Sequence, residues 1–217
     1  MRTIVFSDSH LTAKFDPAKF LYLQKIIEPA SRVIIVGDFW DGYMTSFTDL
    51  LNSGWAKLFA LLKSKDTLYV CGNHDAAALN DPRTHQFAKS CTEVLELVID
   101  GINYHFEHGH RIVKTLDGKF PWLFQRSWIA SAAAKLEEIA ARIFGFKFFL
   151  IHKPMNARIK RWQRKHLRPD QVLVCGHSHW PELDEPKNFI NSGFIRHHFA
   201  HHLVIEDGRT KLIRQRY

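Results

Sequence analysis

Four short runs of apolar, mostly β-branched residues are predicted to form buried strands. They lie at residues 3–7, 33–36, 67–71 and 171–175. Each run is apolar almost throughout, which is typical of strands covered on both faces. Residues 15–28 and 45–63 separate the first three runs and read as helices; the second carries an apolar stripe at helical spacing. The alternation predicts helices packed on a sheet, and therefore an α/β fold.

Two further pairs of strand-like segments are each divided by an Asp-Gly dipeptide. They are residues 94–100 with 102–107, and residues 199–206 with 210–216. Asp-Gly between two such segments is a strong signal for a β-hairpin. Hairpins beside the buried strands predict two sheets flanked by helices.

The segment at about 118–168 breaks this rhythm. Residues 128–144 place apolar side chains at helical spacing, and residues 154–167 form a second, very basic helical stretch. An aromatic cluster at 144–150 separates the two. We interpret the segment as a helical insertion on one domain that spans residues 1–217.

Charge is concentrated in the same part of the chain. The net charge is +8, yet residues 114–168 carry 13 Lys and Arg against 3 Asp and Glu, and the remainder carries 17 against 19. Solvated helices are one interpretation. A cap facing a membrane surface or a lipid substrate is the second, favoured by Trp122, Phe124, Trp128 and Trp162. Nucleic-acid binding is less favoured, because no nucleic-acid motif accompanies the charge.

No apolar run reaches the roughly 18 to 20 residues that span a bilayer, and residues 2–6 lead directly into Asp8 without a secretory signal. Cys71, Cys91 and Cys175 are odd in number and widely spaced, which fits reduced thiols. We therefore expect a cytoplasmic protein, and the basic insertion adds the expectation of peripheral attachment to the inner membrane.

Residues with metal-ligand chemistry follow the predicted strands. The segments are Asp8-Ser9-His10, Gly37-Asp38-Phe39-Trp40-Asp41, Gly72-Asn73-His74-Asp75, His108-Gly109-His110 and Gly176-His177-Ser178-His179. Donors just past strand ends gather at one edge of an α/β sheet. Mixed oxygen and imidazole donors suit Mn²⁺, Fe²⁺ or Zn²⁺ better than Mg²⁺ or Ca²⁺. The absence of cysteine among these donors argues against a structural zinc site.

One such motif alone would be weak, because similar residues occur in ordinary loops. Five segments, each at a strand end, favour a metal site over chance. A binding scaffold that has lost catalysis is the remaining alternative, and the presence of every expected type of ligand argues against it.

The five segments, in this order, resemble the calcineurin-like metallophosphoesterase superfamily. The resemblance implies a four-layer α/β/β/α sandwich and two divalent ions, with Mn²⁺ expected first and Fe²⁺ or Zn²⁺ as alternatives. It assigns one ion to Asp8, His10, Asp38 and His179. It assigns the other to Asp38, Asn73, His108 and His177, so that Asp38 bridges the two ions.

Such a centre supplies hydroxide for in-line attack on phosphorus, and no protein nucleophile is needed. His74 is then expected to stabilise charge or to protonate the leaving oxygen, with Asp75 orienting it. Asp41 is expected to orient a metal-binding histidine from outside the ligand shell. His110 and Arg111 follow His108 closely, and either substrate contact or simple packing would explain them. The histidines near the C-terminus are expected to be structural or solvent-facing: His197, His198, His201 and His202.

Within the superfamily the layout most resembles the UDP-2,3-diacylglucosamine pyrophosphatases of lipid A synthesis, whose insertion receives acyl chains. His74 departs from that subgroup, which has Arg after the ligand Asn. Protein Ser/Thr phosphatases fit less well, because Gly42 stands where they have Arg. We predict a metal-dependent hydrolase that cleaves a phosphodiester or pyrophosphate in a nucleotide-linked lipid precursor. A soluble phosphodiesterase or nucleotidase is the alternative, and a non-catalytic interaction module comes third.

Overall fold

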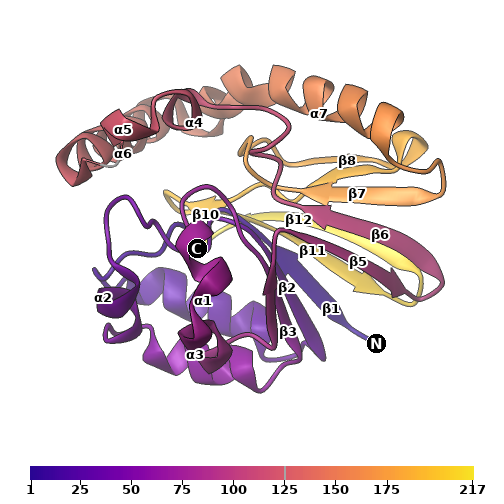
Figure 1. The fold of residues 1–217 in the computed structure, drawn as a ribbon, viewed down its shortest axis with the longest axis horizontal. Coiled ribbons are helices and arrows are strands. Elements are labelled where there is room, and N and C mark those ends of the chain that lie inside the picture. The colour runs from indigo at the N-terminus through magenta and orange to yellow at the C-terminus, as the bar shows by residue number, and fades with distance from the viewer. Residues whose placement is uncertain (125) are drawn as a thin grey trace.

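The computed structural model describes residues 1–124 and 126–217. Two β-sheets lie face to face, with helices on their outer sides (Figure 1). The first sheet has seven strands in the order β10-β11-β1-β2-β3-β4, with β12 paired to β11. Its strands are β1 (Thr3–Phe6), β2 (Arg32–Val36), β3 (Thr67–Val70), β4 (Ser90–Thr92), β10 (Ile195–Arg196), β11 (Phe199–Glu206) and β12 (Arg209–Arg216).

The second sheet has five strands in the order β5-β6-β7-β9-β8. They are β5 (Val94–Ile99), β6 (Ile102–Glu107), β7 (Gln171–Cys175), β8 (Glu182–Asp184) and β9 (Phe189–Asn191). The four apolar runs form β1, β2, β3 and β7, and the two Asp-Gly hairpins are β5–β6 and β11–β12, so these predictions are confirmed. Strands β1, β2 and β3 run parallel, as do β6 and β7.

The continuous apolar character of β1 follows from burial on both faces. Ile4 and Phe6 pack with the helices, whereas Val5 points into the core between the two sheets. The neighbouring strand β2 divides in the same way, with Ile35 on the helix side and Ile34 on the inter-sheet side. Alternate side chains of these strands therefore pack into two different cores, which explains their apolar character.

Helices α1 (Pro17–Ile27), α2 (Phe47–Leu51) and α3 (Ala56–Lys63) form the first outer layer (Figure 1). The prediction of one helix over residues 45–63 was wrong, because the chain turns between α2 and α3. Gly54 lies in that turn, where a Cβ atom would come within 2.7 Å of the Phe15 ring. A glycine is needed for this close approach, and it also disfavours a continuous helix.

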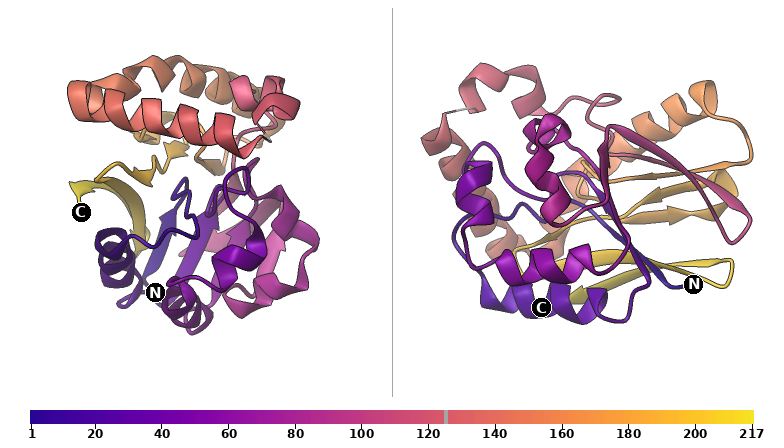
Figure 2. Two further views of the ribbon diagram at one scale, coloured as in Figure 1. Left: turned by 90° about the vertical axis from the view of Figure 1, so that its left-hand side faces the viewer. Right: turned by 60° about the horizontal axis from the view of Figure 1, so that its bottom comes forward.

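The predicted insertion forms a cap of short and long helices. It contains α4 (Leu116–Lys119), α5 (Pro121–Phe124), α6 (Ser127–Phe144), the 3-10 helix η3 (Gly145–His152) and α7 (Lys153–His166). Helix α7 covers the second sheet, where Ile159 packs with Leu173 and Phe189, and it completes the four layers. The rest of the cap extends over the loops of the first sheet (Figure 2).

Phe149 of η3 anchors the cap. Its side chain is fully buried and packs with Phe194 and Phe199 beside β10 and β11. Three shorter 3-10 helices lie in loops, namely η1 (Ala76–Asn80), η2 (Pro82–Gln86) and η4 (Glu185–Lys187). Within the described part of the chain, no helix is long and apolar enough to cross a membrane.

Candidate metal centre

The structure brings all seven predicted ligands to one place, at the carboxyl ends of parallel strands from both sheets. Asp8 and His10 follow β1, Asp38 follows β2, Asn73 follows β3, His108 follows β6, and His177 and His179 follow β7. Two hydrogen bonds join the loops: the Asp8 amide donates to the Gly37 carbonyl at 3.0 Å, and the His177 amide donates to the Asp8 side chain, at Oδ2, at 3.0 Å. The second bond links the two sheets at the site.

The ligand loops adopt an uncommon backbone conformation. Five of the predicted ligands have φ between 43° and 64°: Asp8, His10, Asp38, His177 and His179. Residues other than glycine uncommonly adopt this left-handed region, and those that do often cluster at active sites and ligand-binding sites. Gly72 supports the same geometry, because a Cβ atom there would collide with the carboxylate of Asp38.

The ligands form two clusters whose donor atoms lie close enough to share an ion. One contains Asp8, His10 and His179, and the other contains Asp38, His108 and His177. In the first cluster His179 Nε2 lies 3.2 Å from Asp8 Oδ1. In the second, Asp38 Oδ2 lies 3.1 Å from His108 Nε2, and the same oxygen is 3.9 Å from His10 Nε2. Asp38 therefore faces both clusters, as a bridging ligand must.

Backbone carbonyls fix the tautomers of two of these histidines. His108 donates from Nδ1 to the Val36 carbonyl at 2.8 Å, and His177 donates from Nε2 to the Val113 carbonyl at 2.7 Å. Burial lowers the pKa of His108, but the charges of Asp38 and Asp8 raise it to about 10, so Nε2 faces Asp38 Oδ2 at 3.1 Å with a proton that a bound cation would displace. Among the described residues, His108 Nε2 and Asn73 Oδ1 are buried without a hydrogen-bond partner. Asn73 Oδ1, and His108 Nε2 once it has lost its proton, are donors that fit divalent metal ions.

The protonation states also suit metal binding. Burial, together with the charge of His74, lowers the pKa of His10 to about 4. Burial and the charge of His108 lower the pKa of His177 to about 3. Burial alone would raise the pKa of Asp38, but the charges of His108 and His74 outweigh it and hold that pKa well below its usual range. Two neutral imidazoles and one carboxylate are the forms that bind cations.

Asp41 contacts both a predicted ligand and the predicted catalytic histidine. Its Oδ1 lies 3.0 Å from His74 Nδ1, and its Oδ2 lies 3.6 Å from His10 Nδ1. Burial lowers the pKa of His74, but the charge of Asp38 and the hydrogen bond to Asp41 raise it to about 9. His74 therefore holds a proton at neutral pH.

Asp75 lies in a different environment from the one expected for it. Its buried carboxylate accepts hydrogen bonds from the amides of Phe39, at 2.6 Å, and Gly72, at 2.5 Å, and from the Tyr69 hydroxyl. These contacts hold two ligand loops together. The Nδ1 atom of His74 donates to the carboxylate of Asp41 instead.

A cavity of about 490 Å³ lies between the metal centre and the cap. Its polar side includes His10, Asp38, Asn73, His74, His177 and His179. The cap contributes an apolar side that includes Leu116, Phe124, Ala133 and Met155. Four cations also line the cavity, namely Lys114, Lys119, Arg158 and Arg196. The arrangement can receive an anionic group next to an apolar one.

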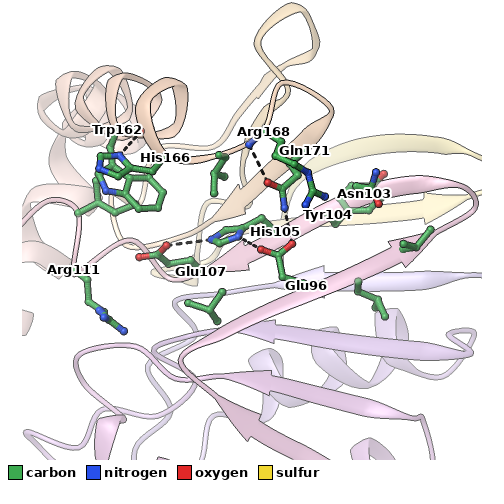
Figure 3. Close-up of a pocket in the computed structure, with 15 residues that line it drawn as sticks. Glu96, Asn103, Tyr104, His105, Glu107, Arg111, Trp162, His166, Arg168 and Gln171 are labelled. Carbon is green, nitrogen blue, oxygen red and sulfur yellow. Dashed lines mark hydrogen bonds and ion pairs between the residues drawn. The ribbon is translucent and has the colours of Figure 1, made fainter.

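His110 and Arg111 do not line this cavity in the part of the chain that the structure describes. The His110 ring packs 5.5 Å from the His108 ring. Arg111 lies at a separate cavity of about 860 Å³, outside the second sheet (Figure 3). It pairs with Glu93 at 2.7 Å. The geometry favours packing for His110 and places Arg111 away from the metal centre.

Several cavity residues were not predicted from the sequence. Asp117 and Glu137 line the cavity from the cap, and Arg196 lines it from β10. A signal was present for the first two, because residues 114–168 contain only 3 acidic side chains among 13 basic ones. An acidic side chain in such a basic segment is a candidate for a specific partner. Arg196 carried no comparable signal.

Comparison with known families decides the assignment. Residues 1–181 match the calcineurin-like phosphoesterase family, and the match includes all seven predicted ligands and the cap. The chain belongs to this family. We therefore interpret the two donor clusters as the metal site expected for a calcineurin-like phosphoesterase. A search of curated proteins found no significant match.

Solved structures support the same fold. An archaeal phosphodiesterase aligns over 99% of both chains with 15% identity and a TM-score of 0.54. Vps29 from Entamoeba histolytica, in complex with Zn²⁺, aligns over 100% of this chain and 99% of its own, with 14% identity and a TM-score of 0.52. A Thermotoga maritima protein aligns over 100% and 99%, with 18% identity and a TM-score of 0.51. At these identities the likeness concerns the fold.

Proposed function

We propose that this protein hydrolyses phosphate esters with the aid of two divalent metal ions. The observation that carries the proposal is the position of Asp38, which faces both donor clusters beside a cavity. Asp8, His10, Asp38 and His179 would hold one ion. Asp38, Asn73, His108 and His177 would hold the other. Mn²⁺ is the ion we would supply first, because the donors are carboxylate, amide and imidazole without thiolate.

Two ions at such a site supply Lewis acidity, which neutralises phosphoryl oxygens and lowers the pKa of the attacking water. The chain itself supplies a proton donor. His74 lines the cavity, and its Nδ1 donates to Asp41 at 3.0 Å. Its Nε2, which lies 3.7 Å from Asp117 Oδ2, is the nitrogen left to face a leaving group. His74 can give a proton to the leaving oxygen, because its Nδ1 donates to the Asp41 carboxylate, which stabilises the protonated ring.

We further propose that the substrate joins a phosphodiester or pyrophosphate to an apolar group, as in a nucleotide-linked lipid such as UDP-2,3-diacylglucosamine. The cavity supports this class because apolar cap residues and four cations share its lining. Leu116 and Phe124 can contact an acyl chain while Arg158 and Arg196 contact phosphate charge. The proposed place of the protein is then the synthesis of lipid A or a similar lipid.

A soluble phosphodiesterase or nucleotidase is the second candidate. It is favoured by His74, which stands where the lipid-nucleotide pyrophosphatases have Arg, and by the structural likeness to an archaeal phosphodiesterase. On this alternative the apolar side of the cavity would receive a nucleobase or another small apolar group.

We also propose that the cap rests on a membrane surface rich in anionic lipids, on the cytoplasmic side. Helix α6 turns an apolar stripe to solvent: Trp128, Leu136 and Ile143 are 67%, 68% and 69% exposed. Helix α7 follows it along the same outer surface and exposes several cations, among them Arg161 and Arg164 (Figure 1). Apolar contact with lipid and attraction to anionic headgroups act together in such a surface.

Hydrolysis assays test the proposed activity. Metal-stripped protein reloaded with Mn²⁺ is offered bis-p-nitrophenyl phosphate, p-nitrophenyl phosphate and UDP-2,3-diacylglucosamine in detergent. We expect preferential cleavage of the lipid nucleotide. Turnover of the generic esters alone would favour the soluble phosphodiesterase, and no turnover by protein with both ions bound would favour a non-catalytic interaction module.

A further inference from the structure

A carboxylate of the cap contacts the metal centre. Asp117, on α4, accepts a hydrogen bond from Asn73 Nδ2 at 2.6 Å. The same oxygen lies 3.7 Å from His74 Nε2, and the Asp117 side chain is 15% exposed. This contact joins residues 44 positions apart in the sequence. It is the point where the cap meets a predicted ligand.

The contact determines which end of the Asn73 amide faces the donor cluster. An ionised carboxylate only accepts hydrogen bonds, so it holds the NH₂ group of Asn73 on the cap side. The amide oxygen, Oδ1, is then turned away from Asp117, and it is buried without a hydrogen-bond partner within the described residues. A rotated amide would place its oxygen against the carboxylate and direct NH₂, which cannot bind a cation, toward the ions.

We propose that Asp117 is a positioning residue that fixes Asn73 Oδ1 for the second metal ion and thereby links the contact between the cap and the metal centre to the occupancy of that site. The inference rests on the proposed two-metal function. If the contact between Asp117 and Asn73 favours the second ion, the second ion must favour this contact by the same free energy.

Two substitutions separate this role from a simple charge effect. Asp117→Asn removes the negative charge near His74 but keeps a carbonyl oxygen that can accept from Asn73. Asp117→Ala removes both the charge and the acceptor. Glu138→Ala is the control, because Glu138 is an acidic cap residue that pairs with Lys135 and Arg142.

The first test titrates Mn²⁺ into metal-stripped protein by calorimetry. We expect Asp117→Ala to lower the affinity for one of the two ions by about 10- to 100-fold, as for other residues that orient a metal ligand. The other ion should bind as in the wild type. The Asp117→Asn variant should retain most of the affinity that Asp117→Ala loses. Two ions bound equally well by wild-type protein and Asp117→Ala would overturn the inference. A wild-type protein that binds no second ion would instead overturn the proposed function.

The second test follows amide hydrogen exchange in residues 114–124 with and without Mn²⁺. In wild-type protein and in Glu138→Ala we expect the ions to slow exchange in this segment. In Asp117→Ala the ions should have no such effect, although the unfolding temperature stays close to that of the wild type. An equal effect of the ions in Asp117→Ala would contradict the link between cap and metal centre.

Discussion

Asp38 and His108 belong to loops of different sheets, yet Asp38 Oδ2 lies 3.1 Å from His108 Nε2. Asp38 follows β2 in the first sheet, and His108 follows β6 in the second. The centre therefore exists only when both sheets are packed together. Binding of a cation between these two side chains should stabilise the packed state by mass action.

His74 gives the clearest prediction about catalysis. His74→Ala should keep both ions but lower kcat by about 10²-fold, because the leaving oxygen loses its proton donor. The loss should be larger for an ester with a poor leaving group than for a p-nitrophenyl ester, which leaves without a proton. Steady-state kinetics on both substrates measure this, with exposed His85→Ala as the control. Equal kcat values for His74→Ala and wild type would exclude His74 as the proton donor.

Asp75 should matter for stability more than for proton transfer. Asp75→Ala leaves the buried amides of Phe39 and Gly72 without their acceptor. Each unsatisfied amide should lower the free energy of unfolding by about 1–3 kcal/mol. We expect a lower free energy of unfolding in urea, whereas Asp41→Asn should mainly lower kcat because Asp41 holds His74. The assignment fails if Asp75→Ala unfolds at the same urea concentration as the wild type.

The exposed face of the cap makes a prediction about membranes. Leu136→Ser with Ile143→Ser should weaken sedimentation with vesicles of phosphatidylcholine and phosphatidylglycerol, and so should Arg161→Gln with Arg164→Gln. Lys160 is not a suitable target, because it pairs with Glu182 and Asp184.

Val98→Ser is the matched control, since Val98 is 61% exposed on β5, outside the cap. With vesicles that lack phosphatidylglycerol, the arginine substitutions should no longer change sedimentation, because only headgroup attraction depends on lipid charge. The substitutions at Leu136 and Ile143 should still weaken it. Equal sedimentation of wild type and both double variants would contradict the proposal that the cap binds a membrane surface.

His105 should make stability depend on pH. It lies between Glu96 and Glu107 on the second sheet, at 2.5 Å and 3.3 Å (Figure 3). Burial lowers its pKa, but the hydrogen bonds to Glu107 and Glu96 raise it above the ordinary 6.5. The pairing should therefore stabilise the fold fully below about pH 6.5 and lose its effect as the pH rises through the folded pKa.

The measurement is the difference in unfolding temperature between wild type and His105→Gln, taken from pH 5.5 to pH 9. We expect the largest difference at the acidic end and a decline toward the alkaline end. A difference that stays constant with pH would mean that packing, and not charge, explains the contribution of His105.

The strands, and the gathering of metal-ligand residue types at their ends, could be predicted from the sequence because both depend on local signals. Ile4, Val5 and Phe6 are apolar because each face of β1 is buried, and Asp8 follows at the strand end. The partnership of Asp117 with Asn73 could not be predicted, because only the tertiary fold brings the cap to the third strand loop. The same holds for Arg111, whose direction depends on its pairing with Glu93.

Two other differences have physical causes that the pattern of residues did not contain. The apolar stripe of residues 45–63 continues across Gly54, so helical spacing alone did not reveal the turn that contact with Phe15 requires. Asp75 follows His74 directly, but its carboxylate is taken by buried backbone amides, which need acceptors more than His74 does.

Metal stoichiometry tests the central claim most directly. Metal-stripped wild-type protein and Asp38→Ala are titrated with Mn²⁺, with exposed Asp170→Ala as the control and circular dichroism to confirm folding. We expect two ions per chain for wild type and Asp170→Ala, and severe loss of both ions together with phosphodiester hydrolysis for Asp38→Ala. Two tightly bound ions in folded Asp38→Ala, or fewer than two in wild type, would contradict a shared Asp38 bridge.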